Sequence, residues 1–207
     1  MSETDSDRER ELKYALESYE DYRKLTEAMA PETGRIQHNH YFDTKELTLA
    51  KARAILRLRV DSGRVILTLK VGQESQEVEG YFDSLELEEE VTVEALDLAR
   101  DDGATLLALD AEPIRELTKR FGASLSLIPI AEMRNERRVV QDEYQLEIDR
   151  VNYSDGGESY EVEIETPDAM GAKDFIETKF QELSISAKPE SKTKLERLLE
   201  RWGKTPE

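Results

Sequence analysis

The segment Arg8-Glu9-Arg10-Glu11-Leu12-Lys13 places two carboxylates and an amine at alternate positions. In a β-strand, alternate side chains lie on the same face, so Glu9, Glu11 and Lys13 share one face. Two carboxylates at this spacing can share a hard divalent cation, and a lysine beside them can meet a phosphate oxygen bound to that cation. The same pattern is also typical of a strand with one solvated face.

Six further segments alternate in the same way, with charged or polar residues on one face and aliphatic residues mainly on the other. Their polar sets are Arg57 and Arg59; Thr68 and Lys70; Glu86, Glu88 and Glu90; Arg134, Glu136 and Arg138; Glu147 and Asp149; and Glu161, Glu163 and Glu165. Two architectures fit this alternation: an antiparallel sheet with one solvated face, or a closed barrel whose polar faces line a tunnel. Paired arginines suit phosphate oxygens and Glu-x-Glu pairs suit a divalent cation, which favours the tunnel.

Composition limits the partners of the chain. Its 207 residues suffice for one domain with a sizeable core, and they include 47 acidic and 29 basic residues for a net charge of −18. Such a surface repels nucleic acid and anionic membranes. There is no cysteine, no apolar run that approaches the roughly 18 residues of a membrane span, and no signal peptide pattern at the acidic N-terminus. We expect a cytoplasmic monomer or homodimer with neither nucleic-acid nor membrane partners.

The chain divides into a predicted disordered acidic tail at residues 1–7 and a single domain at residues 8–203. Strands are predicted at 8–16, 38–44, 55–60, 65–70, 81–91, 124–141, 144–153 and 159–166, the sixth of them bent near Pro129. Helices are predicted at 17–30, 93–109, 112–121, 169–183 and 192–202. We therefore predict an α+β fold in which an eight-stranded antiparallel β-barrel with a polar interior is covered by helices.

The order of these motifs resembles that of the CYTH superfamily, the triphosphate tunnel metalloenzymes, from residue 9 to about residue 199. The segments that carry the resemblance are Glu9-x-Glu11-x-Lys13, Tyr41-Phe42-Asp43-Thr44, Leu56-Arg57-x-Arg59, Thr68-Leu69-Lys70, Leu146 to Asp149, and Val162-Glu163-Ile164-Glu165. One departure is Asn39, which stands where the family often has aspartate.

The resemblance implies a tunnel in which acidic pairs hold Mg²⁺ or Mn²⁺ and basic residues hold a linear triphosphate. The implied metal ligands are Glu9, Glu11, Asp149, Glu163 and Glu165. The implied triphosphate ligands are Lys13, Arg57, Arg59, Lys70 and Arg134, with Arg138 added from strand parity and Lys192 as a match to a lysine before the last helix. Glu9, Glu11 and Lys13 form the implied catalytic set. The sequence leaves open the register of Arg134, Arg137 and Arg138, and that of Glu161-x-Glu163 against Glu163-x-Glu165. His38 and His40 are interpreted as incidental exposed residues.

The implied chemistry is hydrolysis. A triphosphate carries about four negative charges, so a tunnel that admits it must supply cations, which also stabilise the leaving pyrophosphate. We predict metal-dependent hydrolysis of inorganic triphosphate by direct attack of water, because no aromatic cluster in the tunnel-facing positions serves an organic ring. Thiamine triphosphate and nucleoside triphosphates are alternative substrates. A class IV adenylyl cyclase that makes cyclic AMP, and a non-catalytic barrel that binds polyphosphate or nucleotide, remain alternative functions.

Overall fold

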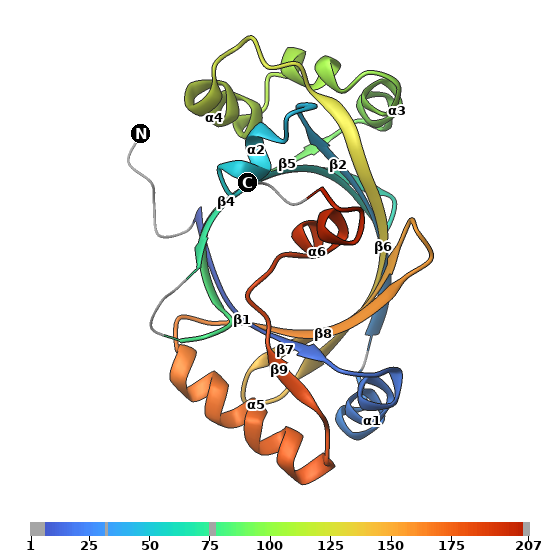
Figure 1. The fold of residues 1–207 in the computed structure, drawn as a ribbon, viewed down its shortest axis with the longest axis vertical. Helices are drawn as coiled ribbons and strands as arrows, with labels where there is room; N and C mark the ends of the chain where they lie inside the picture. The colour runs from blue at the N-terminus through green and yellow to red at the C-terminus, as the bar shows by residue number, and fades with distance from the viewer. Residues whose placement is uncertain (1–6, 32, 75–77, 205–207) are drawn as a thin grey trace.

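The protein is a closed antiparallel β-barrel of eight strands, as the sequence predicts (Figure 1). The computed structural model describes residues 7–31, 33–74 and 78–204. The barrel strands are β1 (Arg8–Leu16), β2 (Thr33–Asp43), β3 (Ala54–Asp61), β4 (Arg64–Glu74), β5 (Tyr81–Val91), β6 (Ile128–Gln141), β7 (Gln145–Tyr153) and β8 (Glu158–Glu165). They follow the order β5-β4-β3-β2-β6-β7-β8-β1, and pairing of β5 with β1 closes the ring.

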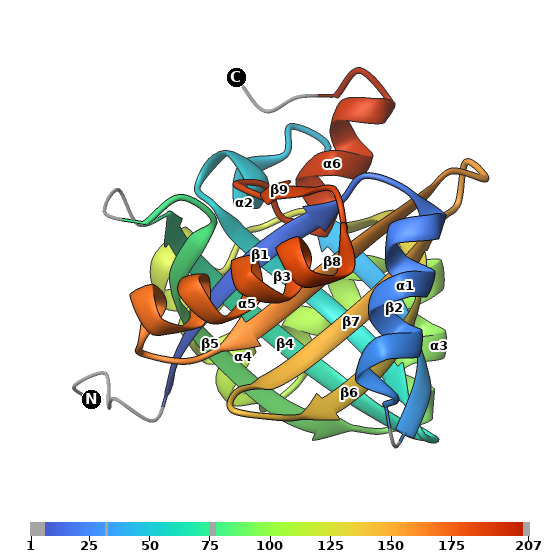
Figure 2. The same cartoon turned by 90° about the horizontal axis from the view of Figure 1, so that it is seen from below.

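Helices cover the barrel on two opposite sides (Figures 1 and 2). On one side lie α1 (Tyr19–Met29) and α5 (Ala169–Leu183), and on the other lie α3 (Val93–Asp101), the 3₁₀ helix η2 (Gly103–Ala108) and α4 (Glu112–Phe121). Two further short helices, α2 (Thr48–Lys51) and α6 (Lys194–Arg201), lie at one end of the barrel. In the part of the chain described, no helix is both long and apolar enough to cross a membrane.

Several boundaries differ from the sequence predictions. The predicted helix 93–109 is divided at Asp102, which ends α3 in an extended conformation and caps the following 3₁₀ helix, with its Oδ1 accepting the Ala104 N–H at 3.0 Å. Strand β2 begins five residues earlier than predicted, and β6 begins at Ile128. A short unpredicted strand, β9 (Ala187–Pro189), pairs with β1 outside the ring order. The predicted tail falls mainly on residues 1–6, which lie outside the described residues.

The aliphatic faces of the strands point outward into two helix-covered cores. One core packs α1 and α5 against residues of β1, β7 and β8 such as Leu12, Ile148 and Val162. The other packs α3, η2 and α4 against residues of β3 and β4 such as Leu56 and Leu67. Because the outward faces are apolar and buried, the charged faces must line the interior, which selects the tunnel over the solvated sheet.

Helix α6 fills one end of the barrel from within. Its residues Leu195, Leu198 and Leu199 pack against the inward-facing side chains of Tyr41 and Tyr153 in a third apolar core. Thr193 caps the helix: its hydroxyl accepts the Glu196 backbone N–H, and the Glu196 carboxylate accepts the Thr193 N–H at 2.7 Å. The capped first turn therefore lies beside the tunnel interior, which brings the side chain of Lys194 into it.

Candidate active site in the tunnel

Inside the barrel lies a cavity of about 70 Å³ whose walls are mainly charged. Its polar lining residues are Glu9, Glu11, Lys13, Tyr41, Arg57, Arg59, Lys70, Glu86, Arg137, Glu163, Thr193 and Lys194. Seven of the predicted site residues are in this set: Glu9, Glu11, Lys13, Arg57, Arg59, Lys70 and Glu163. We call it the charged cavity.

Lys70 of β4 gathers carboxylates from two other strands. Its Nζ contacts Glu9, lies 2.8 Å from Glu11 Oε1, and lies 3.7 Å from Glu86 Oε2. Burial favours the neutral amine, but Glu11 and Glu9 more than offset this, so the pKa of Lys70 lies well above its ordinary value. Burial raises the pKa of Glu9 well above its ordinary value, against the opposing effect of Lys70. The neighbouring carboxylates of Glu11 and Glu86 raise it further.

Lys13 links the two acidic parts of the cavity. It pairs directly with Glu163 across β1 and β8, and its Nζ lies 2.9 Å from Glu163 Oε1 and 3.6 Å from Glu11 Oε1. Burial opposes ionisation of Glu163, yet Lys13, Lys194 and Arg137 together hold the pKa of Glu163 well below its ordinary value. The carboxylate is therefore charged and is shared among three cationic side chains.

Asp149, Glu161 and Glu163 form a buried acidic trio on β7 and β8. Each can offer one carboxylate oxygen such that the three oxygens lie within 4.8 Å of one another. Lys194 reaches this trio from α6, with its Nζ 3.0 Å from Asp149 Oδ2, 2.9 Å from Glu163 Oε1, and in contact with Glu161. Three clustered carboxylates are the hard oxygen donors that Mg²⁺ and Mn²⁺ prefer, so these residues fit either ion.

Three arginines supply the remaining positive charge. An amine of the Arg57 guanidinium lies 3.1 Å from Glu86 Oε1, and one of Arg59 lies 3.8 Å from Glu88 Oε1. Arg137 of β6 forms a two-pronged pair with Asp149 at 2.9 and 2.7 Å and also donates to Glu163 at 2.6 Å. Such planar donors match the paired oxygens of a carboxylate or a phosphate.

The prediction that Arg134 and Arg138 face the tunnel is wrong. Arg137 is the cross-strand partner of Asp149 and shares its inward face. Arg134 and Arg138 lie an odd number of positions from Arg137, so they point outward. Arg138 donates to the hydroxyl of Tyr22, which belongs to the outer core, and Arg134 forms a surface ion pair with Glu136. Both faces of β6 are polar here, because its outer face is partly solvated, so charge parity alone selected the wrong face.

The placement of Lys192 in the site is also wrong, and Lys194 takes that position. Lys192 is exposed and pairs with Glu200 at 2.7 Å. The Thr193 cap and the Glu196 that completes it mark Lys194 as the first helical residue, a signal present in the sequence.

The remaining predicted residues are placed as follows. Asp149 lies fully buried in the trio, whereas Glu165 is exposed one step beyond Glu163 on the same face. The sequence left open whether Glu161 and Glu163 or Glu163 and Glu165 form the acidic pair. The trio contains Glu161 and Glu163. His38 is exposed as expected, but His40 is buried, with its Nδ1 3.1 Å from Glu132 Oε1. Glu86 of β5 lines the charged cavity. The alternation places it on the charged face of its strand, but the sequence predictions do not include it among the site residues.

Fold and site together define a barrel with a charged, metal-competent tunnel. A family model for the CYTH domain matches residues 7–199, and the chain belongs to that family. A candidate adenylyl cyclase from Hippeastrum, described as revealing a dominant triphosphatase activity, is 26% identical, with a TM-score of 0.82 over 95% of this chain and 96% of that one. A candidate adenylate cyclase from Bacillus halodurans is 22% identical, with a TM-score of 0.73 over 92% and 98% of the two chains. A search of curated proteins finds no significant match.

Proposed function

We propose that this protein is a metal-dependent hydrolase of a linear triphosphate, with inorganic triphosphate as its substrate. The observation that carries the proposal is a cavity lined by Lys13, Lys70, Arg57 and Arg137, and also by Glu163, which belongs to the acidic trio that could share a divalent cation. The triphosphatase activity described for the Hippeastrum protein supports the same choice. Neither a nucleophilic side chain nor a covalent intermediate is required.

The cations and carboxylates of the cavity are paired with one another, and binding would exchange these partners. Phosphate oxygens would replace carboxylates at Lys13, Lys70 and the arginines. Mg²⁺ or Mn²⁺, held by Asp149, Glu161 and Glu163 and by Glu9 and Glu11, would supply positive charge at the phosphoryl group. Every buried charge keeps a partner through this exchange, which avoids the cost of leaving one unpaired.

The residues of the chain then stabilise the charge that develops during hydrolysis. A water oxygen forms a bond to a terminal phosphorus while the bond from that phosphorus to the bridging oxygen breaks. The departing pyrophosphate takes the electron pair, and Arg57, Arg59 and Arg137 are the donors that would hold its oxygens. A proton of the attacking water passes to a phosphate oxygen.

The test is a substrate panel. Phosphate release from tripolyphosphate, ATP and thiamine triphosphate is measured with Mg²⁺, with Mn²⁺ and with EDTA. We expect turnover of tripolyphosphate that EDTA abolishes. The absence of metal-dependent turnover of any substrate would refute the proposal. Cyclic AMP among the ATP products would establish the cyclase instead, and tight tripolyphosphate binding by calorimetry without turnover would establish a binding protein.

A further inference from the structure

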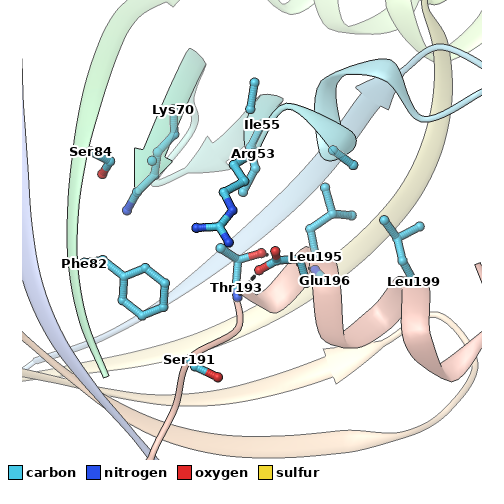
Figure 3. Close-up of a pocket in the computed structure, with 13 residues that line it drawn as sticks. Arg53, Ile55, Lys70, Phe82, Ser84, Ser191, Thr193, Leu195, Glu196 and Leu199 are labelled. Atoms are coloured by element: carbon cyan, nitrogen blue, oxygen red, sulfur yellow. Dashed lines mark hydrogen bonds between the residues drawn. The ribbon is translucent and has the colours of Figure 1, made fainter. Parts of the chain in front are cut away.

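A second polar cavity lies on the outside of the barrel, apart from the tunnel. It has a volume of about 230 Å³ and lies over β2, β6 and β7, on a stretch of the barrel wall between α1 and α3 that no helix covers in Figure 1. Residues at the tunnel end that α6 closes, such as Lys70 and Leu195 in Figure 3, do not line it. We call this space the outer cavity.

Three side chains with hydrogen-bond donors form a row across the three strands of the outer cavity. Arg134 of β6 is the cross-strand partner of His38 on β2 and of Asn152 on β7. Cross-strand partners lie side by side on one face of a sheet, and this face is opposite to that of the inward-facing Arg137. The row therefore presents an imidazole, a guanidinium and an amide to one space, which all three line.

Two members of this row have donors to spare. The Nδ2 of Asn152 is buried and has no hydrogen-bond partner within the described residues. Arg134 contacts Glu136 through Nη1, and a guanidinium has five N–H donors. A buried donor without a partner costs free energy, and a ligand oxygen at this point would remove that cost. Ser154, in the turn after β7, adds an exposed hydroxyl to the lining.

The carboxylate that lines the outer cavity is already engaged. Glu132 Oε1 lies 3.1 Å from His40 Nδ1 and 3.9 Å from the Nε of Arg100. Burial lowers the pKa of His40, so its ring is uncharged at neutral pH and can donate one N–H to this carboxylate. Glu132 thus has a donor and a positive charge beside it. The groups left for a ligand are mainly donors, which suit an anion better than a cation.

We infer that the outer cavity binds a phosphate dianion, free or as a phosphomonoester, with Arg134, Asn152 and His38 as its ligands. The planar donors of a guanidinium match two oxygens of a phosphate, and an amide and an imidazole N–H can each meet a further oxygen. His38 and Ser154 are exposed, so the ion can enter from solvent. The site lies outside the tunnel, and the inference does not depend on the proposed function.

The two histidines of the chain provide a local probe, because His38 and His40 both line the outer cavity. Their imidazole NMR signals are recorded at pH 8, where an ordinary imidazole is uncharged. Inorganic phosphate or glycerol phosphate then replaces chloride at constant ionic strength. We expect a saturable shift of the His38 signals with either phosphate, and the lower half-saturating concentration identifies the preferred form. Lys70→Met, in the charged cavity, should give the same titration.

Substitutions in the row test its members separately. Arg134→Ala should raise the half-saturating concentration by about 10- to 150-fold, the range for one charge-assisted hydrogen bond. Asn152→Leu should raise it by about 2- to 13-fold, the range for one neutral hydrogen bond. Arg138→Ala is the matched control: Arg138 lies on the same outer face of β6 but does not line the cavity, so its replacement should leave the titration unchanged.

The outcomes decide the inference whatever the activity of the tunnel. The absence of a saturable shift in wild type, or equal midpoints for Arg134→Ala and Arg138→Ala, would overturn it. Loss of the response in Lys70→Met would also overturn it, because the phosphate would then bind in the tunnel. If wild type hydrolyses no triphosphate but shows the expected titrations, the proposed function fails and the outer phosphate site stands.

Discussion

Replacing Lys194 with methionine tests the centre of the proposed site. The Lys194 ammonium is buried and pairs with Asp149 and Glu163 at 3.0 and 2.9 Å, as well as with Glu161. Methionine keeps most of the side-chain volume and removes the charge. The acidic trio then keeps Lys13 and Arg137, which contact Glu163, and Arg197 of α6, which contacts Glu161. Removing one member of a buried ion pair costs about 3–5 kcal/mol. For a chain of this size that loss corresponds to a decrease in Tm of about 6–20 °C.

The measurement is urea-induced unfolding in EDTA, with Lys192→Met as the matched control. Lys192 is 47% exposed and pairs with Glu200, so its replacement should cost no more than about 1 kcal/mol. Adding Mn²⁺ should stabilise Lys194→Met more than wild type, because the divalent cation restores the missing positive charge. If both variants lose the same stability, or if Lys194→Met stays within about 1 kcal/mol of wild type, the ammonium does not balance the trio and the assignment is wrong.

Three further predictions concern single residues. Arg137→Ala should lower kcat/KM for tripolyphosphate by about 10- to 150-fold, the equivalent of one charge-assisted hydrogen bond. In the same steady-state assay the control Arg138→Ala should stay within about twofold of wild type. A larger loss in Arg138→Ala than in Arg137→Ala would contradict the inward placement of Arg137. Glu11→Gln should abolish most turnover and also lower the Tm, because it removes the buried charge that pairs with Lys70. Wild-type activity in this variant would exclude Glu11 from the site. Burial lowers the pKa of His40, so the unfolded chain binds more protons than the folded one as pH falls below about 6.5. The free energy of unfolding of wild type should therefore decrease from pH 7 to pH 5 more steeply than that of His40→Gln, and parallel pH profiles would rule this out.

The apolar face of most strands predicts a sheet or a barrel, and the same-face arginine and Glu-x-Glu pairs, with the resemblance to the CYTH family, favour the barrel. Where one face is strongly apolar, as in β1, β3 and β8, parity places the charged residues correctly: Glu11, Arg57 and Glu163 all reach the tunnel. On β6 both faces are polar, and only the pairing of Arg137 with Asp149 in the folded barrel determines which face is inward. Such a register depends on residues distant in sequence, which no local pattern contains.

The alternation of charged and apolar residues also does not predict that α6 closes one end of the barrel. The leucines at 195, 198 and 199 predict an amphipathic helix, but the same stripe would suit a helix on the outer surface. Its apolar partners, Tyr41 and Tyr153 among them, lie on inner faces that are charged further along the tunnel. The change from apolar to charged along one face becomes visible only when the strands are assembled.

The charge of the tunnel resolves the conflict between an acidic protein and an anionic substrate. The whole chain has a net charge of −18, but the charged cavity is lined by six basic and four acidic side chains. Surface charges beyond about 8 Å are largely screened at physiological ionic strength, so the substrate responds mainly to the lining. Asp149 and Glu161 lie behind this lining and pair with Arg137 and Lys194, so a divalent cation would be needed to offset the roughly four negative charges of a triphosphate. The lining carboxylates are thus needed for more than metal binding, because without them the buried ammonium groups of Lys13 and Lys70 would have no partner in the absence of substrate, at a cost of several kcal/mol for each buried charge.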